Sequence, residues 1–204
     1  MPYRETERTR ARAADARERI LRAAHDQLAA GGYASASVAA VAARAGVATG
    51  TVYRHFPSKA DLLAEVFRRA ASREVEAVAA AGGHGAAQRI ASAVEVFVRR
   101  ALSEPRRAYA LLAEPVDPAV EAQRLVCRRT SAEVFAAILR DGVAAGELAP
   151  MDVDLVAAAC VGALGEALVG PLARHDAAPE ALVTALQSFC LSAISAGSPH
   201  VRHA

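Results

Sequence analysis

Apolar side chains recur every three or four positions along most of this chain, with polar side chains between them. This spacing places the apolar residues on one face of an α-helix. The first clear case covers residues 15–30, with apolar positions at Ile20, Leu21, Ala24 and Leu28. Gly31 and Gly32 come next and are expected to end the helix. Stretches that alternate with a period of two are short, alanine is abundant and β-branched runs are few, so we predict an all-α protein.

Residues 37–63 contain a stretch that departs from this pattern, because too few of residues 49–55 are apolar for a core helix. A short helix is predicted over residues 38–45, and Gly46 can adopt the left-handed conformation that ends it. A second short helix is predicted over residues 49–55, before Pro57. Its side chains are mostly small and polar or basic, so it is unlike a core helix. A helix, a glycine turn and a polar helix form the helix-turn-helix pattern, whose second helix enters the major groove of DNA.

The segment AGVATGTVYRHFPSKADLL, residues 45–63, resembles the signature of the TetR family of transcriptional regulators. The matching positions, at fixed spacing, are Ala45-Gly46-Val47, Gly50-Thr51-Val52-Tyr53, His55-Phe56 and Ser58-Lys59. The resemblance extends over residues 17–67. Ala48 departs from it, since the family often has serine there, and we expect Thr49 to cap the helix instead. The resemblance implies an N-terminal three-helix DNA-binding domain with a helix-turn-helix, followed by a helical ligand-binding and dimerisation domain.

The polar helix and its flanks supply the predicted DNA contacts. These are Ser37, Thr49, Gly50, Thr51, Tyr53, Arg54, His55 and Lys59. The threonines and the arginine can read base edges, the glycine lets the backbone approach, and the remaining side chains suit phosphates. Ser37 is also a predicted N-cap, and Lys59 adds a cation at the start of a helix. The alternative for each residue is an ordinary exposed helix position.

The overall formal charge of +2 hides an asymmetry between the two parts of the chain. Residues 1–73 contain 13 Lys and Arg against 7 Asp and Glu, a net charge of +6, whereas residues 74–204 contain 11 against 15, a net charge of −4. A basic N-terminal part suits an anionic partner such as DNA, although solvated helices alone could show the same drift. Residues 1–14 form an arginine-rich arm that is expected to be disordered, or alternatively to gain order on DNA.

Glycine and proline divide the rest of the chain into a long connecting helix and about five further helices. The expected ranges are 59–80, 86–103, 105–114, 118–145, 152–168 and 179–197. We therefore divide the chain into a DNA-binding domain with its arm (1–58), a connecting helix (59–82) and a ligand-binding and dimerisation domain (83–204).

The last two helices are apolar on more than one face. In the final helix, one stripe is Leu182, Leu186 and Phe189, and the other is Val183, Cys190 and Ile194. One face is expected to meet a second subunit, and the resemblance implies the same homodimer. A twofold dimer would bind a palindromic operator. The apolar stretch at 153–172 is interpreted as a buried helix that ends at Pro171, and not as a membrane span.

The resemblance also implies a small-molecule cavity among the middle helices. Its predicted lining is Phe97, Tyr109, Leu112, Glu114, Arg128, Phe135, Cys160 and Leu164. Because this lining is mostly apolar, we expect a hydrophobic or amphipathic effector that releases a repressor from its operator. The alternative for each residue is a core or solvated position.

Catalytic chemistry finds little support in the sequence. No nucleophile, base and acid share a suitable spacing, and the histidines are scattered. Cys127, Cys160 and Cys190 lie in apolar helical patterns without metal-ligand spacing, which favours buried free thiols. No hydrophobic segment follows the N-terminal arginines. We expect a cytoplasmic regulator, not an enzyme, that needs no cofactor, metal or membrane. The alternatives are a TetR-like regulator without an effector, a helical enzyme with a ligand pocket, or a structural dimerisation module.

Overall fold

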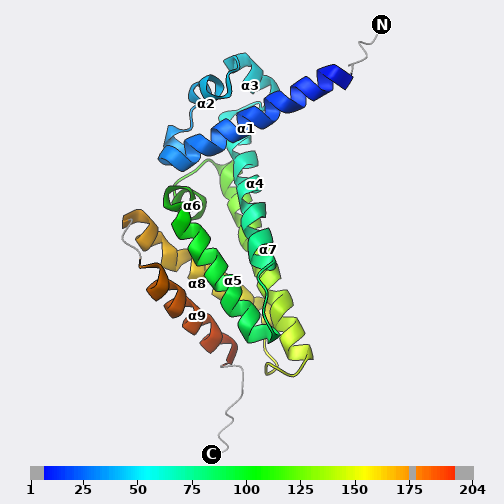
Figure 1. Ribbon diagram of the computed structural model, residues 1–204, viewed down its shortest axis with the longest axis vertical. Helices are drawn as coiled ribbons and strands as arrows, with labels where there is room; N and C mark the ends of the chain where they lie inside the picture. The colour runs from blue at the N-terminus through cyan, green and yellow to red at the C-terminus, as the bar shows by residue number, and fades with distance from the viewer. Residues whose placement is uncertain (1–6, 175–177, 196–204) are drawn as a thin grey trace, which may run out of the picture.

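The computed structural model describes residues 7–174 and 178–195, and every regular element in that part of the chain is an α-helix (Figure 1). The predicted all-α fold is therefore confirmed. The helices are α1 (Glu7–Ser35), α2 (Val38–Ala45), α3 (Thr49–His55), α4 (Lys59–Ala79), α5 (Gly85–Ser103), α6 (Pro105–Leu112), α7 (Pro118–Ala144), α8 (Val153–Arg174) and α9 (Pro179–Ser195).

The helix-turn-helix, α2 and α3, begins and ends where the sequence predicts. Ser37 caps α2, since its Oγ accepts a hydrogen bond from the backbone N–H of Ala40 at 3.1 Å. Gly46 ends α2 in the left-handed region, at φ 63° and ψ 41°. At the end of α3, the N–H of Phe56 donates to the carbonyl of Val52 at 2.9 Å, and Pro57 follows. Local signals are therefore enough to set this motif.

The first helix is longer than predicted. It begins at Glu7, so the part of the arm at residues 7–14 is helical, because arginine and alanine there favour helix. Gly32, at φ 73°, interrupts the helical geometry close to the predicted end. The first six residues of the arm, and the predicted end of the last helix near residue 197, lie outside the described residues.

Two further local predictions are wrong. Ala48 is itself the N-cap of α3 and no side chain caps the helix there, so Thr49 does not take over that role. The eighth helix does not end at Pro171 but continues to Arg174. Proline removes one backbone donor, and its partner would be the carbonyl of Ala167. Because Ala167 is an exposed residue, water can replace the lost hydrogen bond.

The fold has two hydrophobic cores joined by α4. The first is built by α1, α2, α3 and the first half of α4, and it also contains Ala110 of α6 and Val120 of α7. The second is built by α5–α9, and α4 reaches it with Val78. Figure 1 shows α4 running from the helix-turn-helix at one end alongside α7. We retain the division of the chain into domains at residues 58 and 82 as a proposal, with α4 as the helix that connects the DNA-binding domain to the rest.

The last two helices each bury one face and expose another. The buried stripe of α8 consists of Ala157, Cys160, Leu164, Leu168 and Leu172, and that of α9 of Val183, Leu186, Cys190 and Ile194. Leu186 therefore lies on the inner face, not with the exposed Phe189 as the sequence suggested. By length and composition α8 could cross a membrane, but such helices also occur in soluble cores, and α8 packs against α6, α7 and α9.

Candidate nucleic-acid interface and regulatory cavity

One face of α3 is exposed and polar, and the other is anchored in the first core. Val52 and Phe56 are buried, with 1% and 4% of their surface exposed. Thr49, Gly50, Tyr53 and Arg54 are exposed and Thr51 is half-buried, so the structure brings the predicted base-reading residues together on one surface. Within the described part of the chain, Arg54 has no carboxylate partner. This surface lies at one end of the molecule (Figure 1).

Two arginines of α1 hold the turn and α3 in place. The guanidinium of Arg19 donates to the backbone carbonyls of Ala45 and Gly46 at the end of α2, at 3.1 Å and 3.0 Å. The guanidinium of Arg17 lies 5.1 Å from the centroid of the Phe56 ring. Sequence reasoning missed both residues. For Arg17 the signal was present, since this residue is three and four positions before Ile20 and Leu21 and so continues their inward-facing stripe.

His55 differs from its exposed neighbours. Its Nε2 atom is buried and has no hydrogen-bond partner among the described residues. Burial lowers the pKa of His55, and the positive charges of Arg54 and Arg17 lower it further. The imidazole is therefore neutral at neutral pH, which removes the charge attraction to phosphate. We leave His55 out of the proposed contact set.

The two flanking residues, Ser37 and Lys59, occupy the starts of helices. Ser37 is exposed beside the free N–H groups of α2. Lys59 is half-buried, and its Nζ donates to the carbonyl of Tyr33 at 3.4 Å. Its ammonium therefore has a fixed neighbour within the protein, which the sequence did not suggest.

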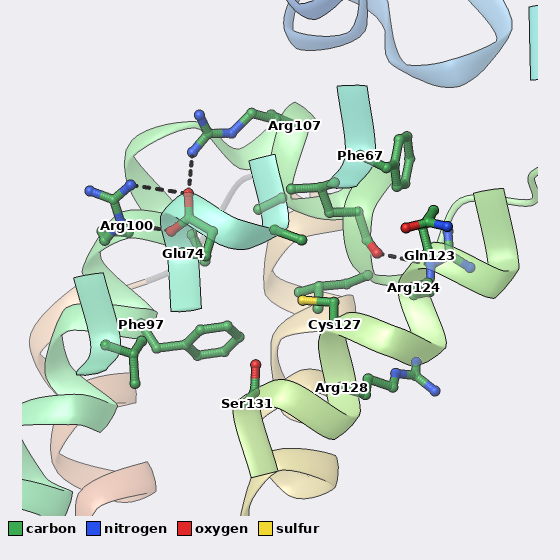
Figure 2. A pocket seen from close by; sticks show the side chains of 16 residues that line it. Phe67, Glu74, Phe97, Arg100, Arg107, Gln123, Arg124, Cys127, Arg128 and Ser131 are labelled. Atoms are coloured by element: carbon green, nitrogen blue, oxygen red, sulfur yellow. Dashed lines mark hydrogen bonds and ion pairs between the residues drawn. The ribbon is translucent and has the colours of Figure 1, made fainter. Parts of the chain in front are cut away.

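A cavity of about 80 Å³ lies between α4, α5, α6 and α7 (Figure 2). Its apolar lining is Phe67, Ala71, Val78, Phe97, Ala101, Ala108, Leu111 and Leu112. Its polar lining is Glu74, Arg100, Arg107, Gln123, Arg124, Cys127, Arg128 and Ser131. A cavity of this kind suits a small apolar or amphipathic molecule.

An ion-paired cluster forms one wall of this cavity. Figure 2 shows Arg100 and Arg107 converging on Glu74, with N–O distances of 2.7 Å and 3.0 Å. The cluster ties α4 to α5 and α6, and the Nε atom of Arg107 is buried with no partner in the part of the chain that the structure describes. Sequence reasoning missed Glu74, although it stands four positions before the buried Val78 on the inward face of α4.

The structure brings only part of the predicted ligand set to this cavity. Phe97, Leu112 and Arg128 line it. Tyr109 and Glu114 line a separate hollow between α1, α6 and α8. The other three, Phe135, Cys160 and Leu164, are packed in the second core with at most 2% exposure, so they are core positions. Among the described residues, no group of three His, Cys, Asp or Glu side chains is placed to hold a metal ion.

Comparisons with known proteins agree with the resemblance found in the sequence. Residues 20–66 match the family described as "Bacterial regulatory proteins, tetR family". Over 57 residues the chain is 49% identical to the HTH-type transcriptional repressor KstR of Mycobacterium tuberculosis, a match that covers 28% of this chain and 26% of the repressor. The chain thus matches about a quarter of this curated relative's length.

Solved structures extend the similarity of the fold to almost the whole chain. The regulator FadR of Bacillus subtilis, in complex with stearoyl-CoA, has a TM-score of 0.75 at 21% identity and covers 87% of this chain and 98% of its own. A transcriptional regulator of Rhodococcus sp. RHA1 has a TM-score of 0.69 at 25% identity and covers 89% of this chain and 96% of its own. At such low identity these likenesses show the architecture and not the ligand.

Proposed function

We propose that the protein is a homodimeric, DNA-binding transcriptional regulator of the TetR family, most simply a repressor, on the premise that its residues 20–66 match that family. The observation that carries the proposal is the exposed polar face of α3, held by Arg17 and Arg19 within the segment that matches the family. A structural dimerisation module would have no use for this surface.

The proposed contacts follow from the reach of each side chain. Thr49, Thr51 and Arg54 face base edges in the major groove, and Gly50 allows close approach of the backbone. Arginine bound to guanine through two hydrogen bonds discriminates by roughly 1–3 kcal/mol. The phosphate contacts are Ser37, Tyr53 and Lys59, which orient the helix without reading sequence.

The proposed dimer forms through α8 and α9. Leu155 and Phe189 support this interface, because they are large apolar side chains with 65% and 49% of their surface exposed. Both lie outside the buried stripes of their helices, where a second copy would cover them. A twofold dimer would place its two α3 helices about 34–36 Å apart, over the two halves of a palindromic operator.

The proposed effector is a small hydrophobic or amphipathic molecule bound in the cavity between α4 and α7. The similar FadR structure holds stearoyl-CoA, an amphipathic molecule, which supports this class. A cavity of about 80 Å³ is smaller than such a molecule, so a large effector must push α4, α6 and α7 apart. Because α4 enters the DNA-binding core, this movement would change the spacing of the α3 helices and lower operator affinity.

A regulator without a small-molecule effector is the second candidate. The small cavity and its ion-paired wall favour it, since both carboxylate oxygens of Glu74 already accept hydrogen bonds from Arg100 and Arg107. In either case the activity takes place in the cytoplasm.

The test is selection of bound duplexes from a random DNA pool by the purified protein, repeated in the presence of candidate hydrophobic effectors. We expect the selected duplexes to share a palindromic consensus and the right effector to weaken their binding. Binding to that consensus that no effector weakens would favour the second candidate. Absence of any enriched duplex at low ionic strength would overturn the proposal.

A further inference from the structure

Tyr33 belongs to the first core, and none of the proposed sites accounts for its contacts. It follows Gly32, where α1 loses helical geometry, and its side chain is buried. Its ring packs edge-on against Phe67 of α4, with ring centroids 6.5 Å apart. Figure 1 shows α6 directly beneath this end of α1. Tyr33 therefore stands between the DNA-binding helices and the helices around the cavity.

On one side, Tyr33 holds Lys59, a proposed phosphate contact. The Nζ atom of Lys59 lies 4.6 Å from the centroid of the Tyr33 ring and donates to the Tyr33 carbonyl at 3.4 Å. A cation over an aromatic face is attracted by the negative charge density of the ring. The position of the ammonium therefore depends on Tyr33.

On the other side, Tyr33 is bonded to the segment between α6 and α7. Its hydroxyl donates to Oδ2 of Asp117, and its backbone N–H donates to Oε2 of Glu114 at 2.8 Å. Burial, together with the hydrogen bond to Asp117, raises the pKa of Tyr33 to about 12, so the phenol keeps its proton at neutral pH. A Cβ atom on Gly32 would lie 2.7 Å from the Glu114 carboxylate, so glycine allows this close approach.

Arg124 holds the last turn of α6 and the start of the same segment from the cavity side. Its guanidinium donates to the backbone carbonyls of Ala110, Leu111 and Glu114, at 3.1 Å, 2.9 Å and 2.8 Å. Arg124 and Leu111 also line the cavity. One short segment therefore contacts both the cavity wall and Tyr33.

We propose that Tyr33 is a positioning residue whose hydroxyl links the α6–α7 segment to Lys59, so that DNA binding and the conformation around the cavity are coupled. This inference rests on the proposed function, since it takes Lys59 to contact DNA. Coupling between two sites is reciprocal. If a shift of α6 changes the position of Lys59, then DNA bound to Lys59 must also change the conformation or mobility of the α6–α7 segment. The link can therefore be tested with DNA alone.

The experiment is hydrogen–deuterium exchange on the full chain, with and without a duplex selected by the wild-type protein, followed at the amides of residues 113–121. In the wild type we expect the duplex to slow exchange by about five-fold or more, the lower end of the usual coupling between sites. Tyr33→Phe keeps the ring beside Lys59 but removes the hydroxyl, so the duplex should still bind while the slowing disappears. Tyr109→Phe is the matched control, because it removes the hydroxyl of a half-buried tyrosine that has no hydrogen-bond partner in the described chain.

Loss of the slowing in Tyr33→Phe, with its retention in Tyr109→Phe, supports the link. Equal slowing in Tyr33→Phe, or no slowing in a wild type that binds the duplex, overturns the link and leaves the proposed function standing. A wild type that binds no duplex overturns both. If Tyr33→Phe does not fold, Asp117→Ala replaces it with the same expected outcomes, since Asp117 makes no side-chain capping bond to α7.

Discussion

Arg19 gives a quantitative test of how α1 fixes the helix-turn-helix, because its guanidinium binds the carbonyl groups at the end of α2. It donates twice to the carbonyl of Ala45, at 3.1 Å and 2.5 Å, and once to that of Gly46, at 3.0 Å. A hydrogen bond to a charged group contributes roughly 1.5–3 kcal/mol. The Arg19 side chain is 40% exposed, so solvent screening reduces that contribution. We expect Arg19→Ala to lower the free energy of unfolding by about 1–2 kcal/mol.

Urea unfolding followed by circular dichroism measures this loss, and fluorescence anisotropy with a selected duplex shows whether α3 is still presented correctly. Operator affinity should fall as well, because the turn that Arg19 holds sets the direction of α3. Arg22→Ala is the matched control, since Arg22 is an exposed arginine one turn further along α1. The reasoning is refuted if Arg19→Ala stays within about 0.5 kcal/mol of the wild type, as ordinary surface substitutions do, and binds the duplex equally well.

Further predictions concern the contacts, the dimer and the stability at low pH. Arg54→Ala should reduce discrimination between operator and unrelated duplexes by about 1–3 kcal/mol, whereas Lys59→Ala should weaken binding to all duplexes alike and reduce the salt slope by about one; identical anisotropy titrations for the two variants would contradict these roles. Phe189→Glu should give folded monomers in light scattering, because this side chain is 49% exposed on α9; intact dimers would rule out the proposed interface. The hydrogen bond from Arg68 is the largest cause that lowers the pKa of Glu65 from 4.5 to about 2, so its contribution to stability is complete above pH 4.5 and is lost as the pH falls through 2. Glu65→Gln should therefore be about 1–2 kcal/mol less stable than the wild type at pH 7, after allowance for screening, and should lose less stability on acidification. If urea unfolding gives the same difference in free energy between the two proteins at every pH, the ion pairs of Glu65 do not contribute in this way.

The helix-turn-helix could be predicted to the residue because its signals are local. Ser37, Gly46 and Pro57 each act on the few backbone groups beside them, and no distant partner is needed to set where α2 and α3 begin and end. The polar face of α3 was also predictable, since a helix with so few apolar residues can bury only a narrow stripe. The prediction of a cap failed at Ala48, where α3 starts with a backbone hydrogen bond from the N–H of Thr51 to the carbonyl of Ala48 and without a side-chain cap.

The cavity could not be predicted because periodicity tells which face of a helix is buried and not what that face meets. Phe97 and Phe135 satisfy the same helical spacing, yet Phe97 lines the cavity and Phe135 is packed in the core. Leu186 and Phe189 likewise looked equivalent on α9. Only the relative placement of the helices distinguishes these pairs.

The contacts of Tyr33 lay beyond the sequence for the same reason. Lys59 follows it by 26 positions and Asp117 by 84. No spacing rule connects residues so far apart. The sequence placed Lys59 at the start of a helix, which is correct, but only the fold shows that Tyr33 holds its ammonium.

Methylation-interference footprinting on a selected duplex shows whether two copies of α3 read neighbouring major grooves. We expect two clusters of major-groove guanines whose methylation blocks binding, related by a twofold axis and centred about 10–10.5 base pairs apart. We also expect Arg54→Ala to remove interference at guanines in both clusters. Binding that tolerates methylation throughout the major groove, or a single cluster without symmetry, would contradict the account.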